Sequence, residues 1–327
     1  MLFATDRGLN NTMRVLLYHR LNIGDLVLAT PAIQWFKAQH PEAEIRLVTN
    51  NLAAHIGDML PDVSQVLSYN KFDATTKNEW RAILQARLWK PDIAIALSPS
   101  ADKRLAYRLL CINNARGYAD TGLIYKLAYR QCLTEQKGSL HIAERLGGLF
   151  GVTDFSTLPA ARLKYQPDPA KPRFAACIHV SARKESNRPS LQQIIAIIDG
   201  IHGRLPGAEI ALTSVPENRI NTAHTADTLF AEELKRAVGG KKITFFDALS
   251  IAENIDLLAR CDSAIMPDGG LMHIAAALGK PTIGLFGNSD PNAWRPFTPR
   301  SRYIQPESRC VADIAPDDIL RVWETLI

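Results

Sequence analysis

Short aliphatic runs alternate with amphipathic helical windows along the chain. In the first half, this pattern predicts strands at residues 14–18, 44–49 and 91–97, and a helix from residue 25 to about residue 39. Such alternation is typical of parallel α/β units. The first half therefore predicts a Rossmann-like β-α-β module, and residues 1–12, which show no apolar periodicity, are expected to form a loose extension.

The pattern restarts after a proline-rich segment at residues 153–173. Each of its four prolines removes an amide donor and disfavours a helix immediately before it. Beyond this segment, strands are predicted at 174–179, 209–213, 243–246, 263–266 and 282–286, and helices at 191–204, 227–238, 252–259, 271–278 and 316–326. We therefore expect two lobes, residues 1–160 and 173–327, joined by a linker at about 153–173.

The expected fold class is α/β, with two Rossmann-like lobes whose parallel sheets face an interlobe cleft. Folds of this kind bind their ligands in the crevice beyond the carboxyl ends of the strands. The turns that follow the predicted strands are therefore the places to search for chemistry.

Composition places the chain among globular proteins. Of its 327 residues, 46% are hydrophobic and 22% are charged, which supports two domains with sizeable cores. No run approaches the ~20 apolar residues that span a bilayer, and the N-terminus lacks an export-signal pattern, so a cytoplasmic protein is expected. The net charge of +5 favours an anionic substrate, a nucleotide or an acidic membrane surface, and is too small to indicate nucleic-acid binding.

Several kinds of site are disfavoured because their motifs are absent. The five cysteines are far apart and include no C-x-x-C pair, which predicts buried free thiols and argues against a disulfide framework or a zinc site. The chain has no GxxxxGK[ST] loop, no HExxH and no GxSxG. It also lacks a D-x-D motif, so we expect no metal ion, and a bound diphosphate would need amides and basic side chains. No cofactor is expected.

The first candidate motif is the turn that follows the first predicted strand. Gly24 permits a tight turn there, and Asp25 opens the following helix. Asp25 is a candidate general base facing a bound hydroxyl. The structural alternative is an N-cap, because aspartate is a preferred residue at that position.

The second candidate motif is the segment MPDGGLMH, where a predicted strand ends and a helix begins. Asp268 can cap this helix while the amides of Gly269, Gly270 and Leu271 point outward and form an anion site. His273 lies on the first turn, where it could reach a phosphate or could make a structural hydrogen bond.

A third candidate is the basic loop that follows the first strand of the second lobe. It places Arg183, Lys184 and Arg188 just before a helix, where they could neutralise a diphosphate. The alternative is an ordinary solvated loop.

Two blocks of the sequence resemble the glycosyltransferase family 9 heptosyltransferases. They are NIGDLVLATPAIQWFKAQHPEAEIRLVTN in the first lobe and IDLLARCDSAIMPDGGLMHIAAALGKPTIGLFGNSDPNAWRPF in the second. The resemblance implies a GT-B fold with an acceptor-binding first lobe and a nucleotide-sugar-binding second lobe. It also implies metal-independent, inverting transfer from ADP-L-glycero-D-manno-heptose to the lipid A–Kdo core of lipopolysaccharide, at the cytoplasmic face of the inner membrane of a Gram-negative bacterium.

Matched position by position, the resemblance assigns roles to single residues. Asp25 corresponds to the base that deprotonates the acceptor hydroxyl. The residues implied to contact the donor are Arg183, Lys184, Asn187, Arg188, Ser214, Glu217, Met266, Asp268, Gly269, Gly270, Leu271 and His273.

The chain departs from the family pattern at two of these positions. Gly269 stands where the family usually has threonine or serine, so a hydroxyl donor to phosphate is lost. Asn187 stands where the family has the lysine of a Lys-x-Trp-Pro motif, and Arg188 or Lys184 would have to replace its charge. Both departures leave the identity of the donor open.

A basic stretch with aromatic residues in the first lobe is the expected docking place for an anionic lipid acceptor and a peripheral membrane surface. The stretch comprises Arg104, Tyr107, Arg108, Arg116, Tyr125, Lys126 and Arg130, of which Arg104, Arg108, Arg116 and Lys126 are the candidate acceptor contacts. The structural alternative is a solvated face.

Other functions stay open at this point. The chain could use another nucleotide sugar, or a capsule or O-antigen acceptor, and the altered basic loop favours this alternative. It could also be a GT-B sugar-nucleotide epimerase, or a nucleotide-sugar-binding protein without catalysis. The presence of Asp25 argues against the last of these.

Overall fold

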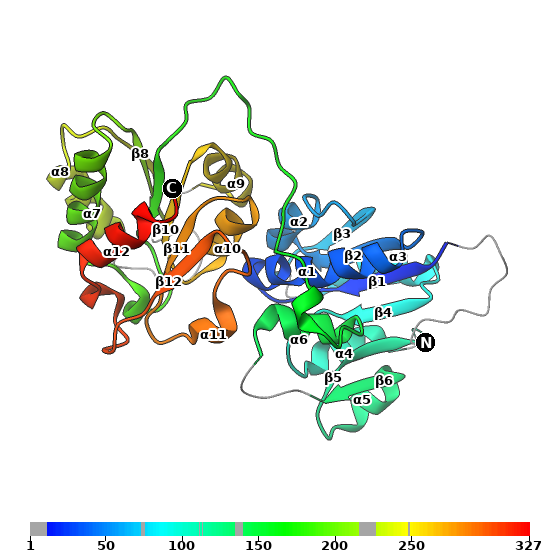
Figure 1. The fold of residues 1–327 in the computed structure, drawn as a ribbon. Helices are drawn as coiled ribbons and strands as arrows, with labels where there is room; N and C mark the ends of the chain where they lie inside the picture. Colours follow the sequence, from blue (N-terminus) through cyan, green and yellow to red (C-terminus); the bar gives the residue numbers. More distant parts are fainter. Residues whose placement is uncertain are drawn as a thin grey trace. The chain divides into compact units, whose positions relative to one another are not determined.

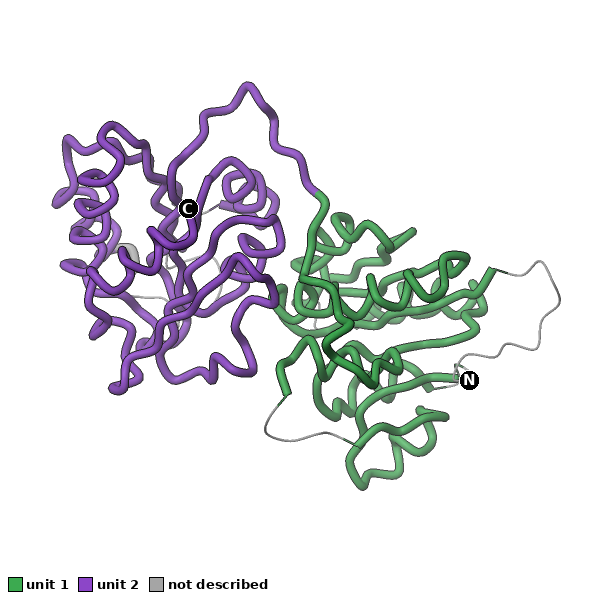
Figure 2. Tube along the Cα trace, in the orientation of Figure 1, with its two compact units in different colours: residues 1–164 green, residues 165–327 purple. Residues whose placement is uncertain are grey.

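The chain folds into two compact units, residues 1–164 and 165–327, in a computed structural model (Figure 2). The structure describes residues 12–72, 76–110, 112, 114–134, 140–215, 227–247 and 249–327. The division between the units falls inside the proline-rich segment. Each unit is described by itself below.

Unit 1 contains a parallel six-stranded sheet with the order β3-β2-β1-β4-β5-β6 (Figure 1). Its strands are β1 (Arg14–Tyr18), β2 (Glu44–Asn50), β3 (Gln65–Tyr69), β4 (Ile93–Ala96), β5 (Ala115–Ala119) and β6 (Gln131–Thr134). Its helices are α1 (Ile23–Gln39), α2 (Asn51–Gly57), α3 (Lys77–Leu88), α4 (Lys103–Leu109), α5 (Leu123–Ala128) and α6 (Ile142–Leu149).

Unit 2 repeats this architecture, with the sheet order β12-β11-β10-β7-β8-β9. Its strands are β7 (Ala176–His179), β8 (Ile210–Ser214), β9 (Ile243–Asp247), β10 (Ala264–Pro267), β11 (Thr282–Leu285) and β12 (Ser301–Ile304). Its helices are α7 (Leu191–Arg204), α8 (Asp227–Ala237), α9 (Ile251–Arg260), α10 (Gly270–Ala277), α11 (Pro291–Trp294) and α12 (Pro316–Glu324), and the short 3-10 turn η2 (Glu185–Asn187) precedes α7.

The two sheets have the same topology. In each, the first strand of the unit lies between its second and fourth strands, so the direction of winding reverses at the pairs β1/β4 and β7/β10. The carboxyl ends of these pairs are where open α/β sheets bind ligands. The α/β fold class with two Rossmann-like lobes is confirmed.

A histidine–threonine pair is repeated at equivalent places in the two units. His19 Nδ1 lies 2.9 Å from Thr49 Oγ1 at the ends of β1 and β2, and His179 Nδ1 lies 2.8 Å from Thr213 Oγ1 in β7 and β8. Burial, with a smaller contribution from Lys71, lowers the pKa of His19 to about 3. His19 is therefore neutral at physiological pH and joins the first two strands of unit 1 as a polar pair inside the core.

The two faces of the unit 1 sheet are covered by different helices. Leu16 and Tyr18 of β1 point into one apolar cluster with the inner sides of α3, α4 and α5. Val15 and Leu17 alternate with them and point to the opposite face, and α1 packs against α2 and α6.

A buried carboxylate connects α3 to α4 and to the end of β1. Glu79 accepts hydrogen bonds from the Tyr18 hydroxyl (2.5 Å), from Arg20 Nε (3.3 Å) and from Arg108 Nη2 (2.8 Å). Burial opposes the ionisation of Glu79, but these hydrogen bonds and the two guanidinium charges hold its pKa below its usual value. Glu79 is therefore ionised in the folded protein and fixes the direction of Arg20.

Replacing Glu79 by alanine is expected to destabilise unit 1 by about 3 kcal/mol at pH 7, because two partly buried guanidinium groups lose their counter-charge. Glu79→Gln, which keeps a hydrogen-bond acceptor, should cost less. The pKa of Glu79 is lowered on folding, so its contribution is present at neutral pH and is lost as the pH falls through the folded-state pKa. Denaturant unfolding at pH 7 and at acid pH measures both effects.

The matched control is Glu44→Ala, because Glu44 pairs with Arg46 at 2.9 Å on the surface of the same sheet. A surface pair of this kind is worth about 1 kcal/mol or less. Equal losses of stability for Glu79→Ala and Glu44→Ala would contradict the role assigned to Glu79.

Candidate functional site

Asp25 lies in the first turn of α1, directly beyond the carboxyl end of β1. It is buried, and its Oδ2 accepts a hydrogen bond of 3.1 Å from the Asn22 amide. Asn22 is the N-cap of α1 and forms a capping box with Asp25, so the expectation that Asp25 itself is the N-cap is wrong. Burial raises the pKa of Asp25, which makes its carboxylate a stronger base than an exposed aspartate.

A lysine that the sequence pattern did not reveal stands beside Asp25. Lys71, two residues beyond β3, has its Nζ 3.5 Å from Asn22 Oδ1, and its charge partly opposes the rise in the pKa of Asp25. Lys71 was not predicted as a site residue because residues 65–69 were not predicted to form a strand. The carboxyl end of β3 therefore adds a cation to the site at the end of β1.

An open hollow of about 490 Å³ lies at the carboxyl ends of β1, β4 and β5. Its lining residues are Arg20, Leu21, Ser98, Ser100, Ala101, Asp102, Lys103, Arg104, Asp120 and Tyr125, and we refer to it as the Arg20 pocket. Three cations and two carboxylates lie among serine hydroxyls in this wall, which suits a ligand that carries both negative charge and hydroxyl groups.

The four candidate acceptor residues occupy different environments. Arg104 lines the Arg20 pocket, whereas Lys126 lies on the exposed side of α5. Arg108 is bound to Glu79, and its guanidinium lies 4.3 Å from the centroid of the Trp80 ring. Arg116 lies within β5 and is only 7% exposed, so the sequence-based expectation that it belongs to a surface stretch is wrong.

In unit 2, α10 begins with unshielded amides at the carboxyl end of β10. Its N-cap is Gly269, and no side chain caps the helix. The expectation that Asp268 is the cap is wrong, because the Asp268 amide continues the sheet by donating to Leu285 O at 2.9 Å. The first amides of α10, beginning at the exposed Gly269, are therefore available to an anion, where the helix dipole favours negative charge.

No steric constraint explains why glycine replaces the family's serine or threonine at position 269. Gly269 has an extended backbone, and a Cβ placed on it would have Pro267 O at 3.8 Å as its nearest neighbour. A serine or threonine would fit there, and nothing in the structure explains the glycine.

Asn187 joins three loops around the start of α10. It is 3% exposed, its Oδ1 accepts from the Gly287 amide at 3.1 Å, and its Nδ2 lies 3.5 Å from Asp268 Oδ2. A Cβ on Gly287 would lie 2.2 Å from Ser186 O, so the loops after β7 and β11 meet without room for a side chain. Asn187 therefore acts on the arrangement of the loops, and its side chain is not exposed as a lysine ligand would need to be.

The remaining residues of the basic loop differ in their freedom. Lys184 is exposed and reaches Ser289 Oγ at 3.3 Å, whereas Arg188 Nε donates to Ala182 O at 3.0 Å and helps to hold the loop. Arg183 is exposed. Lys184 thus connects the loop after β7 to the loop after β11. The lysine of the family motif is replaced by Asn187 in the same loop.

Other predicted donor contacts are buried or lie at the sheet edge. The side chains of Met266 and His273 are 0% and 4% exposed, so the Met266 side chain belongs to the core of β10, and its place among the donor contacts stays a prediction. Ser214 Oγ donates to Asp247 Oδ1 at 2.5 Å. Glu217 lies outside the described residues.

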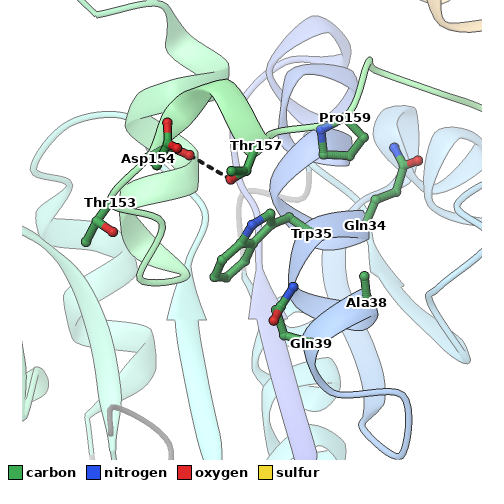
Figure 3. A pocket seen from close by; sticks show the side chains of 8 residues that line it. All are labelled: Gln34, Trp35, Ala38, Gln39, Thr153, Asp154, Thr157 and Pro159. Atoms are coloured by element: carbon green, nitrogen blue, oxygen red, sulfur yellow. Dashed lines mark hydrogen bonds between the residues drawn. The ribbon is translucent and has the colours of Figure 1, made fainter.

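A second hollow of unit 1, of about 530 Å³, is shown in Figure 3. It lies between the last turns of α1 and the segment after α6, and Trp35, Gln39, Asp154 and Pro159 are among its lining residues. None of the predicted site residues lines it.

The described cysteines are free thiols, and they are buried at Cys177 and Cys261 and half-buried at Cys310. Cys132 is exposed, so the expectation of buried thiols is wrong for it, and Cys111 lies outside the described residues. Within the described part of the chain, no group of three His, Cys, Asp or Glu side chains could hold a metal ion.

Comparison with known proteins finds a family match in unit 2. The model of glycosyltransferase family 9 (heptosyltransferase) matches residues 207–323. Lipopolysaccharide heptosyltransferase 3 of Escherichia coli is 25% identical over 307 residues, which are 84% of this chain and 84% of that protein.

Two solved structures of Escherichia coli share the fold. ADP-heptose lps heptosyltransferase II superposes with a TM-score of 0.77 at 17% identity, covering 96% of this chain and 98% of that one. Heptosyltransferase WaaC with ADP gives a TM-score of 0.75 at 17% identity, covering 96% and 100%. At this identity they establish the two-lobed GT-B fold.

Asn187→Asp is expected to destabilise unit 2 by about 1–3 kcal/mol at pH 7, because a second carboxylate would then lie beside Asp268. Mutual repulsion raises the pKa of the pair, so the folded state takes up a proton more readily than the unfolded chain. Stability should therefore recover as the pH falls through the raised pKa. Thermal unfolding between pH 7 and pH 5 measures the recovery.

Asn288→Asp is the matched control, since Asn288 is exposed in the neighbouring loop. This substitution should leave the unfolding temperature nearly unchanged at both pH values. If Asn187→Asp behaved in the same way, the coupling of Asn187 to Asp268 would be refuted.

Proposed function

Because the chain belongs to glycosyltransferase family 9 and is a glycosyltransferase, we propose that it transfers heptose from ADP-L-glycero-D-manno-heptose to the inner core of lipopolysaccharide. The observation that carries the proposal is the open N-terminus of α10, which lies inside the family match. Lys184 adds a cation that reaches Ser289 in the loop after β11. The name of the Escherichia coli relative supports the sugar and the acceptor.

Unit 2 is the proposed donor-binding unit. The amides of Gly269, Gly270 and Leu271 would bind the diphosphate, and Lys184 and Arg183 would supply the positive charge. These groups stabilise the charge that develops on the departing diphosphate more than the charge of the bound donor, which accelerates the reaction. The similar solved structure of Escherichia coli heptosyltransferase WaaC contains ADP, which supports adenine as the base of the nucleotide.

Unit 1 is the proposed acceptor-binding unit. Asp25, with its raised pKa, would take the proton of the acceptor hydroxyl as this oxygen attacks the anomeric carbon from the face opposite the diphosphate. Direct displacement of this kind inverts the anomeric configuration. Lys71 beside Asn22 would then help to stabilise the charge near the attacking oxygen.

The Arg20 pocket is the proposed place of the anionic acceptor. Arg20, Lys103 and Arg104 would pair with phosphate or carboxylate groups of the inner core, while Asp102 and Asp120 would accept hydrogen bonds from sugar hydroxyls. Glu79 holds Arg20 in place before the acceptor arrives, which lowers the entropic cost of binding.

We further propose that transfer needs no metal ion and takes place at the cytoplasmic face of the inner membrane. The absence of a D-x-D motif supports the first part. The family that the sequence resembles uses a lipid-linked acceptor, which supports the location at the membrane. In the described chain, no helix is long and apolar enough to cross a membrane.

A second candidate is a family 9 enzyme with another nucleotide sugar or with a capsule or O-antigen acceptor. Asn187 and Gly269 favour it, because both replace residues that would otherwise contact the donor phosphates. In the same loop, the exposed Arg183 and Lys184 would supply the positive charge in place of that lysine.

Calorimetric titration of the full chain with ADP, UDP and GDP in EDTA distinguishes the two candidates. We expect binding of ADP in preference to the other two nucleotides, because the diphosphate contacts are common to all three and only the base differs. Preference for UDP or GDP, or binding that needs a divalent metal, would overturn the assignment of ADP-heptose.

Asp25→Asn is expected to reduce turnover by roughly 10²–10⁴-fold while leaving ADP affinity nearly unchanged, because the base is lost and the donor site is in the other unit. Asn keeps an oxygen that can accept from the Asn22 amide. Since burial raises the pKa of Asp25, removing its charge should leave stability at pH 7 equal or higher. Thermal unfolding alongside the kinetic assay checks this control, and unchanged turnover would remove Asp25 from the role of base.

A further inference from the structure

A hollow of about 530 Å³ in unit 1 takes no part in the proposed reaction. One wall is formed by the last turns of α1, with Trp35 and Gln39, and the other by residues 153–159, which follow α6 (Figure 3). Its volume lies within the range of about 300–1,000 Å³ that small-molecule sites occupy. We call it the Trp35 hollow.

The two walls of the Trp35 hollow are fixed to each other. The buried rings of Phe36 in α1 and Phe150 after α6 meet with their centroids 5.7 Å apart. Gln34, which lines the hollow, donates from Nε2 to Ala160 O at 3.3 Å. The hollow is therefore formed before a ligand binds, which lowers the entropic cost of binding.

Trp35 gives the hollow an aromatic face. The side chain is half-buried, and its indole extends from α1 toward the segment that carries Asp154 and Thr157 (Figure 3). An indole N–H usually has a hydrogen-bond partner when the ring is buried, but the Trp35 Nε1–H has none within the described part of the chain. Trp35 therefore offers a ligand an apolar ring and one unused donor.

The polar groups of the hollow include unused donors and unused acceptors. The Gln39 amide and the Thr153 hydroxyl make no hydrogen bond to any described residue. Asp154 Oδ1 accepts from the amide and the hydroxyl of Ser156, at 3.0 and 2.7 Å, whereas no described group donates to its Oδ2. The hydrogen bonds from Ser156 hold the pKa of Asp154 below its usual value, so this acceptor is charged at neutral pH. A ligand hydroxyl, which both donates and accepts, suits such a mixture.

The charge of the Trp35 hollow disfavours anionic ligands. Among the described residues that line it, Asp154 alone is charged. The Arg20 pocket of the same unit, by contrast, has three cations and two carboxylates in its wall. A phosphate or carboxylate group in the Trp35 hollow would be repelled by Asp154 with no cation in the lining to balance it.

We propose that the Trp35 hollow binds a neutral pyranose sugar. A sugar ring combines an apolar C–H face with a rim of hydroxyl groups. The C–H face packs on the Trp35 indole, and the hydroxyls exchange hydrogen bonds with Gln39 and Asp154.

This sugar site is distinct from the reacting groups. Trp35 follows Asp25 in the continuous helix α1, and the 35 − 25 = 10 residues between them place the two about 15 Å apart along the helix axis. The bound sugar is therefore not the one whose hydroxyl reacts. The inference rests on the proposed saccharide acceptor for its purpose, because a second sugar site would retain the enzyme on an extended or branched saccharide. Its test uses neither donor nor acceptor, so it can fail while the proposed reaction holds, and the reverse.

Saturation-transfer NMR of the full chain tests the site with three neutral probes, the methyl glycosides of β-D-glucose, β-D-galactose and α-D-mannose. At least one should bind with a dissociation constant on the order of 1 mM, the strength expected of a ligand this small. Methyl β-D-glucuronide, which differs from the glucoside by a carboxylate, should bind roughly fivefold more weakly because Asp154 repels it.

Variants of the lining residues locate the bound glycoside. Trp35→Ala should weaken its binding about tenfold, whereas Trp35→Phe keeps an aromatic face and should retain most of the affinity. Gln39→Ala should weaken binding about fivefold, because hydrogen bonds to the sugar are lost. Gln39 is exposed and bonds to no described residue, so this variant decides the question even if Trp35→Ala fails to fold.

Matched control variants lie on α3 of the same unit. Trp80 is 38% exposed and Gln85 is exposed, so Trp80→Ala and Gln85→Ala remove the same kinds of side chain outside the hollow. Arg104→Gln checks whether the Arg20 pocket holds the glycoside instead. All three variants should bind the glycoside like the wild type.

Three outcomes would overturn the proposal. These are no saturation transfer to any neutral glycoside, losses in the control variants equal to those in the Trp35→Ala and Gln39→Ala variants, and binding of the glucuronide that equals or exceeds that of the glucoside. Stronger binding of choline than of the glycosides would assign the hollow to an organic cation instead.

Discussion

Parallel strand pairing governs what this protein can do. In each unit, every strand of the sheet runs in the same direction, so the loops that could carry chemistry all emerge from one edge. Because the winding direction reverses at β1/β4 and at β7/β10, the loops of these neighbouring strands diverge and leave a crevice between them. Asp25 and the open amides of α10 stand at these two places.

The same topology serves opposite electrostatic purposes in the two units. In unit 1, the helix after the first strand is capped by Asn22 and Asp25, and burial of the Asp25 carboxylate raises its pKa. In unit 2, the helix after the fourth strand begins at Gly269 with no capping side chain. One helix start therefore holds a buried carboxylate, while the other leaves its first amides without a capping side chain.

Sequence periodicity predicted most of unit 2 because its strands are apolar runs bounded by clear turns. It missed β3, β5 and β6 of unit 1 and β12 of unit 2. In β3 and β5, Ser68, Arg116 and Gly117 interrupt the apolar pattern although the strands pair in the sheet. Sequence periodicity also did not predict which side chains are buried. Arg116 was assigned to a surface stretch and Met266 to the donor contacts by the resemblance, but both lie in strands that are buried on both faces.

The candidate site was predictable in its elements and not in its internal contacts. Asp25 and the Asp268–Gly270 turn follow strands in the sequence, so their positions could be inferred. The capping role of Asn22 is local, because Asn22 and Asp25 lie in one turn, whereas the contact of Asn187 with Gly287 depends on loops brought together by folding.

Asn187 shows what such contacts add to the functional argument. A lysine at this position would place an ammonium group beside Asp268, whereas the neutral amide joins Asp268 to the loop after β11 and leaves Lys184 to carry the charge. At this turn the buried amide of Asn187 connects the loops, and the exposed cation lies three residues earlier, at Lys184. A mobile ammonium on an exposed stem adapts to the diphosphate more readily than a buried one, at the expense of the rigid placement that a buried lysine would have had.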